Sequence, residues 1–370
     1  MKDIKLSFLP KLALVLFCLI SLTYIAVLGQ SLLAPLLFSF LMAILLLPAA
    51  NLMERKLSFK RSLSTIFSVV LMIVVIGSIV YFFGNQLSDL WSDWPLLKEK
   101  ANVSYHELQA WISHTFGVNT NKQLAYLNDS TEKALATSAT IVATTLATLS
   151  STLLFLGFTL LFTFFILNYR RVLFTFLTSV FKEEHKEKVA EIASQIQYII
   201  KKYIIGLFLQ MLIVTLLMIT ILSVLGVKYA VLLGLVTGIF NVVPYLGIFF
   251  ALVISCLITF ATAGAAKVLL IVVVFVAVHA VDGNILMPLV VGSKVKINAL
   301  IAFIGIVVGE MIWGISGMFL CIPYLAILKI IFDRIDVLQP WGILMGEEHK
   351  PVKKKRVYRI TKKIQLEEKD

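Results

Sequence analysis

The stretch NVVPYLGIFF, residues 241–250, lies in the middle of a run, residues 229–266, that carries no charged side chain. One straight helix through this run would be about 57 Å long, roughly twice the thickness of the hydrocarbon core of a bilayer. Pro244 removes a backbone donor and clashes with the preceding turn, and Gly247 admits unusual dihedral angles. The run is therefore predicted to fold back on itself between Asn241 and Gly247.

Each half of the folded run has about 15 to 20 residues, which is marginal for a full crossing and suits a re-entrant hairpin whose tip lies within the membrane. Non-helical backbone at that depth is tolerated only beside protein or a water-filled cavity. Asn241 and Tyr245 flank Pro244 at this tip, where an amide and a phenol could bind a polar solute. Alternatively, they satisfy the backbone groups that the proline frees.

The composition places the whole chain in a membrane. Of 370 residues, 59% are hydrophobic and 15% are charged, which is outside the range of soluble globular proteins. Apolar runs long enough to span a bilayer recur along the sequence. They are residues 12–28, 32–50, 63–83, 141–168, 203–225 and 268–290, in addition to 229–266 and 297–328. We predict an all-α polytopic membrane protein with about eight membrane segments, two of them broken or re-entrant.

The second broken segment is residues 297–328, which would be about 48 Å long as one helix. Gly309, Gly314 and Gly317 interrupt it, and Glu310 adds a charge. A second hairpin, beginning and ending on the cytoplasmic side, fits both its length and the flanking charges. Two full crossings in either broken segment would leave the same ends on the same sides, so this alternative stays open.

Basic residues indicate the orientation of the chain. Lys2, Lys5 and Lys11 place the amino terminus in the cytoplasm, and the basic tail places the carboxy terminus there too. The start resembles a signal peptide, but no cleavage pattern follows, so an uncleaved first span is expected. The predicted regions are amino-terminal transmembrane helices (1–83), an extracytoplasmic helical region (84–138), a transmembrane helix (139–168), a cytoplasmic amphipathic helix (169–202), a carboxy-terminal core with both broken segments (203–332) and a basic cytoplasmic tail (333–370).

Several classes of function are not indicated. The formal charge of +12 comes mainly from residues beside the apolar runs and in the tail, so membrane lipids rather than nucleic acid are the expected partners. The three cysteines lie in apolar runs without metal-like spacing, and no metal or other cofactor is predicted. Motifs of soluble enzymes are missing, so we do not expect an enzyme. Glycine- and alanine-bearing helices could pack closely in a homo-oligomer.

Polar side chains inside the membrane are expensive, so each is a candidate for function. His279 and Asp282 lie three residues apart and could exchange protons or coordinate a cation. Alternatively, Asp282 is hydrated at the cytoplasmic end of its span. Glu310 is the other acid, with a water-exposed loop tip as the alternative interpretation. Gln210 is predicted to form a hydrogen bond between helices.

Three motifs in order resemble the AI-2E transporter family, the PerM-like permeases. They are NVVPYLG at 241–247, DGNILMPLVVGSKVKINAL at 282–300 and GISGMFLCIPYLAILKII at 314–331. The resemblance implies a multi-pass protein of the bacterial plasma membrane that moves small solutes without hydrolysing nucleotides. Some members of the family are assigned to autoinducer export and others to the exchange of sodium or lithium for protons.

The resemblance carries over to individual positions. The matching residues are Pro244, Tyr245 and Gly247 of the first signature, Asp282 as its usual acid, Pro288 as the following proline, and Gly314, Gly317 and Pro323 of the final glycine-rich pair. Two departures stand out. Ile248 replaces a frequent second proline, and Glu310 replaces a frequent second glycine, which puts a copied substrate assignment in doubt.

We therefore expect an ion-coupled exporter of a small polar solute similar to autoinducer-2. The expected solute-binding residues are Asn241, Pro244, Tyr245, Gly247 and Asn284. The expected ion-coupling residues are Asp282, His279 and Glu310, and the expected hinge residues are Gly309, Gly314, Gly317, Pro288 and Pro323. The alternatives are a sodium or lithium/proton antiporter and a non-transporting membrane scaffold.

Overall fold

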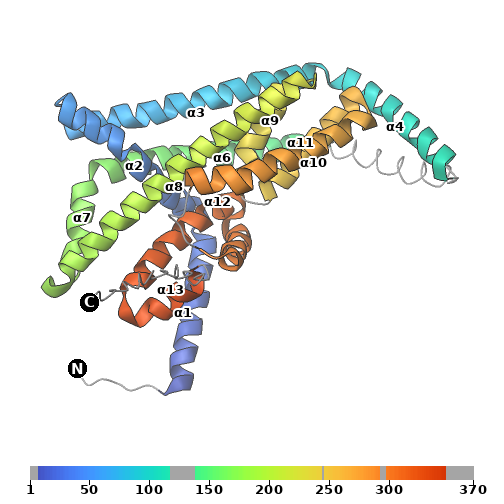
Figure 1. Cartoon of the computed structure of the whole chain (residues 1–370). Helices are drawn as coiled ribbons and strands as arrows, with labels where there is room; N and C mark the ends of the chain where they lie inside the picture. Colours follow the sequence, from blue (N-terminus) through green and yellow to red (C-terminus); the bar gives the residue numbers. More distant parts are fainter. Residues whose placement is uncertain (1–6, 117–137, 244–245, 292–296, 347–370) are drawn as a thin grey trace, which may run out of the picture.

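The structure, a computed structural model, describes residues 7–116, 138–243, 246–291 and 297–346. All regular elements in these residues are helices, which confirms the all-α class (Figure 1). They are α1 (Phe8–Leu28), α2 (Gln30–Lys56), α3 (Arg61–Ser92), α4 (Trp94–Phe116), α6 (Ser138–Asn168), α7 (Arg170–Ser179), α8 (Glu183–Val224), α9 (Ala230–Phe240), α10 (Leu246–Ala263), α11 (Ala265–Val281), the π-helix η1 (Asp282–Val291), α12 (Ala299–Arg334), the 3-10 helix η3 (Asp336–Leu338) and α13 (Gln339–Met345).

Seven helices within the described residues are long and apolar enough to cross a bilayer. The two shorter apolar helices, α9 and α10, are the halves of the run 229–266 that was predicted to fold back. Between membrane helices there is no transfer from water to drive association, so close packing and hydrogen bonds must hold the bundle together. The polytopic helical class predicted from the composition is therefore confirmed.

The first broken segment is a helical hairpin. α9 is about 17 Å long and α10 about 27 Å, so α9 is too short to cross a bilayer. Both ends of the hairpin lie on one face of the molecule, because the amine of Lys267, just after α10, donates a hydrogen bond to the carbonyl of Gly226, just before α9, at 3.2 Å. The chain leaves α9 in a turn at 241–243, where the amide of Val243 donates to the carbonyl of Phe240.

The hairpin is held against α8 by glycines. A Cβ on Gly238 would lie 1.7 Å from Oγ1 of Thr215 and 2.9 Å from the carbonyl oxygen of Met211. One turn earlier, a Cβ on Gly234 would lie 2.9 Å from the amide nitrogen of Ile219. This small-xxx-small pattern lets the backbones of α8 and α9 approach closely, as is typical of membrane helices. The position of the hairpin tip therefore depends on α8.

The second broken segment is also a hairpin, contained in α12. Trp313 and Gly314 have non-helical dihedral angles, and Gly314 has φ 60° and ψ −138°, which side chains with a Cβ rarely adopt. The two arms pack so tightly that a Cβ on Gly317 would lie 1.9 Å from the carbonyl oxygen of Gly309. The bend is thus at Trp313 and Gly314, while Gly309 and Gly317 are packing positions within the arms. The first arm, 299–312, is about 21 Å long and too short to span.

The fifth apolar run and the preceding amphipathic stretch form one helix, α8, which has 42 residues. It is about 63 Å long, so roughly half of it extends beyond a bilayer core. Residues 169–182 form the separate short helix α7 and a turn. α8 contributes buried side chains both to the core that it shares with α9, α10 and α11 and to the core that it shares with α2 and α12. It therefore links the two hairpins.

Polar contacts join loops that were predicted to lie on the same side of the membrane. On the predicted cytoplasmic side, Arg170 at the start of α7 pairs with Glu54 near the end of α2, and Arg334 pairs with Glu191. On the other side, Lys228 before α9 pairs with Asp93 between α3 and α4 at 2.7 Å. The hydrogen bond from Lys228 lowers the pKa of Asp93 below its ordinary value. The contacts agree with the predicted alternation of sides.

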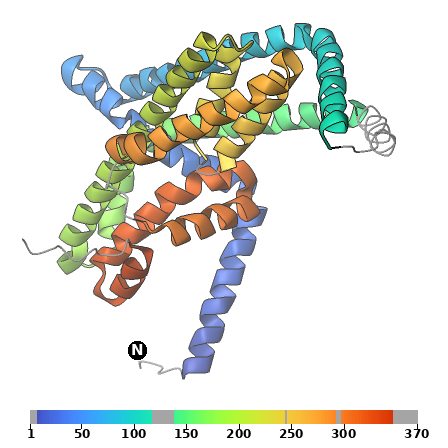
Figure 2. The same cartoon turned by 45° about the vertical axis from the view of Figure 1, so that its right-hand side comes forward.

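Helix α1 stands apart from the rest of the bundle. It runs away from the other helices in both views (Figures 1 and 2), and it has no buried residue. Its carboxy-terminal end is attached at the second hairpin, where the indole nitrogen of Trp313 donates to the carbonyl of Ala26 at 2.8 Å. The next helix is attached to the same hairpin, since the hydroxyl of Tyr324 donates to the carbonyl of Leu37 in α2.

Candidate functional site

Asp282 lies at the junction of α11 and η1, and only 5% of it is exposed. α11 is a regular apolar helix that begins beside Gly264 and brings the chain about 26 Å inward from that face. The helix then widens into the π-helix Asp282–Val291. Within this segment Pro288 lacks the amide that a regular helix would bond to the carbonyl of Asn284, so one bond of the α-helical pattern is missing there. Such π-segments are rare and are frequently found at functional sites.

Two amide side chains bind the carboxylate of Asp282. Nε2 of Gln210 donates to both carboxylate oxygens, at 2.8 and 3.0 Å, and Nδ2 of Asn241 donates to Oδ2 at 3.3 Å. Gln210 comes from the middle of α8 and Asn241 from the tip of the first hairpin, and each is 7% exposed. Three elements that are far apart in the sequence therefore converge on one buried carboxylate.

No positive side chain balances this carboxylate within the described residues, whose salt bridges do not include Asp282. The side chain of His279 is exposed and is not among the hydrogen-bond donors to Asp282. A buried charge bound only by neutral amides is costly, because amide dipoles replace only part of its hydration. A small cation that reached the carboxylate would balance its charge.

A small cavity adjoins the carboxylate. Its volume is about 10 Å³, close to the least that can hold one water molecule. Asp282, Asn241 and His279 line it together with Thr237, and its remaining lining is apolar. We infer from the lining that a single water or ion between Asp282 and His279 would have polar partners on both sides.

A much larger cavity, of about 680 Å³, shares no described lining residue with the small one. Both broken segments line it, with Val242, Val243 and Gly247 from the first and Ile315, Ser316 and Phe319 from the second. Aromatic side chains of α2, α6 and α8 complete the wall, and Ser316 carries the only polar side chain among the described residues of the lining. The two hairpins thus meet at one cavity, whose lining does not include Asp282.

The structure brings together only part of the predicted site. Asp282 and Asn241 are joined, Gly247 forms part of the large cavity, and Gln210 makes the predicted bond between helices. Asn284 is exposed, and its side-chain amide donates to the carbonyl of Ala280, one turn earlier at the end of α11, at 2.8 Å. Pro244 and Tyr245 lie outside the described residues, as does the side chain of Pro288.

The predicted residues of the second hairpin lie elsewhere. Glu310 is exposed near the bend of α12. Among the described residues, the hydrogen bonds of Asp282 are to Gln210 and Asn241 and do not involve Glu310. Pro323 is buried inside the second arm, which continues as a helix through it. Of the hinge residues predicted in this hairpin, only Gly314 lies at the bend itself.

Sequence reasoning did not identify Thr237 or the aromatic wall of the large cavity. Phe38, Phe155, Phe208 and Phe319 occur in apolar stretches of their helices, where residues that face lipid and residues that line a cavity have the same composition. Thr237 could have been identified from the sequence, because it lies one helical turn before Asn241 on the same face.

Comparisons with known proteins support a transport function. A family model described as "AI-2E family transporter" matches residues 14–336. YrrI of Bacillus subtilis (strain 168), a presumed transport protein, is 34% identical over 128 residues, 35% of this chain and 36% of the relative. The AI-2 transport protein TqsA of Escherichia coli (strain K12) is 26% identical over 129 residues, 35% of this chain and 38% of TqsA. Each of these two matches covers little more than a third of the relative's length.

One match covers much more of the chain at a lower sequence identity. A presumed transport protein of Alkalihalophilus pseudofirmus is 21% identical over 314 residues, which is 79% of this chain and 79% of the relative. The similarity to transport proteins therefore extends over most of the chain and is not limited to the signature motifs.

Proposed function

Because the chain belongs to the AI-2E transporter family, we propose that it exports autoinducer-2 or a similarly small polar solute across the bacterial plasma membrane in exchange for protons. One observation carries the proposal beyond the family: the buried carboxylate of Asp282 is bound by Gln210 and Asn241 at the tip of a broken segment. Acids inside membrane proteins of this kind usually face a bundle interior or cavity and serve in ion or proton pathways.

Asp282 is the proposed coupling residue. Its charge has no cationic partner among the described residues, so a proton arriving from the aqueous side would neutralise it. Protonation would weaken the hydrogen bonds from Gln210 and Asn241, because charge-assisted bonds are the stronger ones. Asn241 forms the hairpin tip, so the protonation state of Asp282 would bias the position of that tip.

The large cavity between the two hairpins is the proposed path of the solute. Broken helices near the middle of a membrane are a recurring feature of transporter binding sites. The hairpins begin on opposite faces in the predicted topology, so each could close the path on one side. The apolar lining suits transient passage of a small solute, and Ser316 supplies the polar side chain of the described lining. The expected contacts of the solute with Asn241 and Tyr245 stay predictions.

A sodium or lithium/proton antiporter is the second candidate. The small cavity beside Asp282 has oxygen-bearing side chains, a carboxylate, an amide and the hydroxyl of Thr237, and hard cations prefer oxygen ligands. In this alternative the cation itself would be the transported species. A non-transporting scaffold is less well supported, because a scaffold has no need of a cavity of about 680 Å³ between two broken segments.

Orientation and assembly are also part of the proposal. Both termini are placed in the cytoplasm by the basic residues that flank the spans and fill the tail. Membrane lipids are the expected partners of the exposed apolar helices, and the chain could form a homo-oligomer. No enzymatic step is assigned, because the Asp282 cluster lacks a nucleophile.

Transport by the purified protein in proteoliposomes tests the proposed function. With vesicles acidified inside by about one pH unit and the membrane potential held at zero by potassium and valinomycin, we expect about tenfold accumulation of labelled autoinducer-2, because one proton exchanged per neutral solute supplies about 1.4 kcal/mol. A sodium gradient alone should drive none. If instead a sodium gradient drives proton movement without autoinducer-2, the antiporter is the better assignment, and the absence of both fluxes would contradict both candidates.

A further inference from the structure

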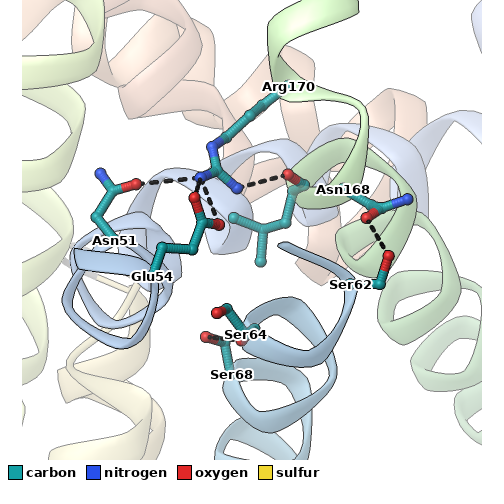
Figure 3. A network of polar contacts seen from close by, with 8 residues as sticks. Asn51, Glu54, Ser62, Ser64, Ser68, Asn168 and Arg170 are labelled. Atoms are coloured by element: carbon teal, nitrogen blue, oxygen red, sulfur yellow. Dashed lines mark hydrogen bonds and ion pairs between the residues drawn. The ribbon is translucent and has the colours of Figure 1, made fainter. Parts of the chain in front are cut away.

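A second polar site lies at the predicted cytoplasmic ends of α2, α3 and α6, far from Asp282 in the sequence (Figure 3). It is an open pocket of about 510 Å³ whose lining is strongly basic. Four arginines face one acidic residue there: Arg55, Arg61, Arg170 and Arg171, with Glu54. Neither the coupling site nor the large cavity uses any of these side chains.

The charge of Arg170 is already balanced by the carboxylate of Glu54. Nη2 of Arg170 donates to both carboxylate oxygens of Glu54, at 2.7 and 2.8 Å, and to the amide oxygen of Asn51 at 3.2 Å. Its Nη1 donates to the carbonyl of Leu167 at 3.0 Å. Figure 3 shows the guanidinium held between the helices by these bonds. Arg170 therefore has a structural role, and its charge is not available to a ligand.

The other three arginines have no acidic partner among the described residues. Arg55 and Arg171 are exposed at the mouth, whereas Nε of Arg61 is buried without a hydrogen-bond acceptor. Like charges at one pocket repel one another, and a buried unpaired guanidinium nitrogen is costly. The pocket thus carries a surplus of about three positive charges that an anion would balance.

Backbone charge adds to this surplus. α3 begins at Arg61, its N-cap residue Lys60 forms no capping bond, and its first turn contains no acidic residue. The amino-terminal end of a helix carries a partial positive charge and free amides, which attract anions. The end of α3 is held in place because Oγ of Ser62 donates to the amide oxygen of Asn168 at 3.2 Å (Figure 3). The amino-terminal end of α3, with its free amides, is therefore fixed beside the pocket.

We propose that Arg55, Arg61 and Arg171 form a binding site for a phosphate group. Guanidinium groups bind phosphate oxygens through paired hydrogen bonds, and basic pockets between membrane helices on this side bind anionic head groups. The pocket lies where apolar spans end, and the exposed ring of Phe59 lines it, so the phosphodiester of an anionic lipid such as phosphatidylglycerol can reach it. A free phosphate has the same recognition chemistry and is the other source.

Binding of defined lipids to the purified full chain tests the site. Native mass spectrometry would follow a titration with phosphatidylglycerol and, separately, with phosphatidylcholine. We expect the variant Arg55→Gln/Arg61→Gln/Arg171→Gln to bind phosphatidylglycerol on the order of 100-fold more weakly than the wild type, with little change for phosphatidylcholine. The single variant Arg171→Gln, which removes no bond seen in the structure, should give a partial loss even if the triple variant folds poorly.

A matched variant, Lys182→Gln/Lys186→Gln/Lys188→Gln at the start of α8, removes three charges outside the pocket and should bind as the wild type does. Inorganic phosphate distinguishes the two sources. If it displaces the lipid at millimolar concentration, the site takes free phosphate as well, and if it does not, the lipid is the ligand. Equal losses in the two triple variants, or unchanged binding in the arginine variant, would overturn the proposal.

Discussion

Replacing Asp282 by asparagine is expected to abolish the accumulation of solute driven by a pH gradient. Asparagine keeps the size of the side chain and can still accept a hydrogen bond from Gln210 or Asn241, but it cannot carry a proton. With about one pH unit across the vesicle membrane, the wild type should accumulate the solute about tenfold, whereas the variant should only equilibrate it. Uptake of labelled autoinducer-2 into proteoliposomes measures both.

Glu310→Gln is the matched control, because it removes the other predicted intramembrane acid by the same isosteric change. Glu310 is exposed and has no part in the Asp282 cluster, so this variant should retain proton-driven accumulation. Melting curves of both variants would show whether the fold is preserved. Accumulation that survives in Asp282→Asn and disappears in Glu310→Gln would remove Asp282 from the mechanism.

Replacing Gly317 by valine is expected to force apart the arms of the second hairpin. A Cβ at Gly317 would lie 1.9 Å from the carbonyl oxygen of Gly309 and 2.7 Å from its carbon, and these backbone atoms cannot move without displacing the arm. Overpacking of this kind costs about 1–3 kcal/mol, and contact with backbone favours the upper end. A lower melting temperature in detergent and loss of transport are the expected results.

Gly77→Val in α3 is the comparison for this change, since a Cβ at Gly77 meets nothing within 4 Å. It should fold and transport as the wild type does, because the glycine is inside a helix where added side chains improve the backbone propensity. Equal destabilisation by Gly77→Val and Gly317→Val would mean that the contact between Gly309 and Gly317 does not hold the hairpin together.

Much of the architecture could be predicted from simple physical limits. Residues 229–266 are too long for one crossing and contain a proline and a glycine at their middle, which left folding back as the simplest solution. The same comparison of the length of a run with the thickness of a bilayer predicted the hairpin in α12. For Asp282 the sequence left two interpretations open, a functional acid inside the membrane and a hydrated residue at the end of its span, and its burial favours the first.

Other features depend on tertiary contacts that sequence does not display. Gln210 and Asp282 are 72 residues apart, and nothing local indicates that α8 and η1 place them within 3 Å of each other. His279 matched the helical spacing of a proton-exchanging pair and lines the same small cavity as Asp282, but it is exposed and is not among the donors to the carboxylate. The continuation of the amphipathic stretch into the span also went unseen, because the change from charged to apolar residues suggested a boundary although no helix breaker separates the two parts.

The central claim is that the two broken segments meet at one cavity through which the solute passes. It is tested most directly by cross-linking Val243→Cys to Ser316→Cys, both in the cavity wall, in a chain whose Cys18, Cys256 and Cys321 are replaced by serine. With a reducible bifunctional thiol reagent, we predict that a cross-link forms in native membranes, that transport stops, and that reduction restores it. No cross-link, or unchanged transport by cross-linked protein, would contradict the account.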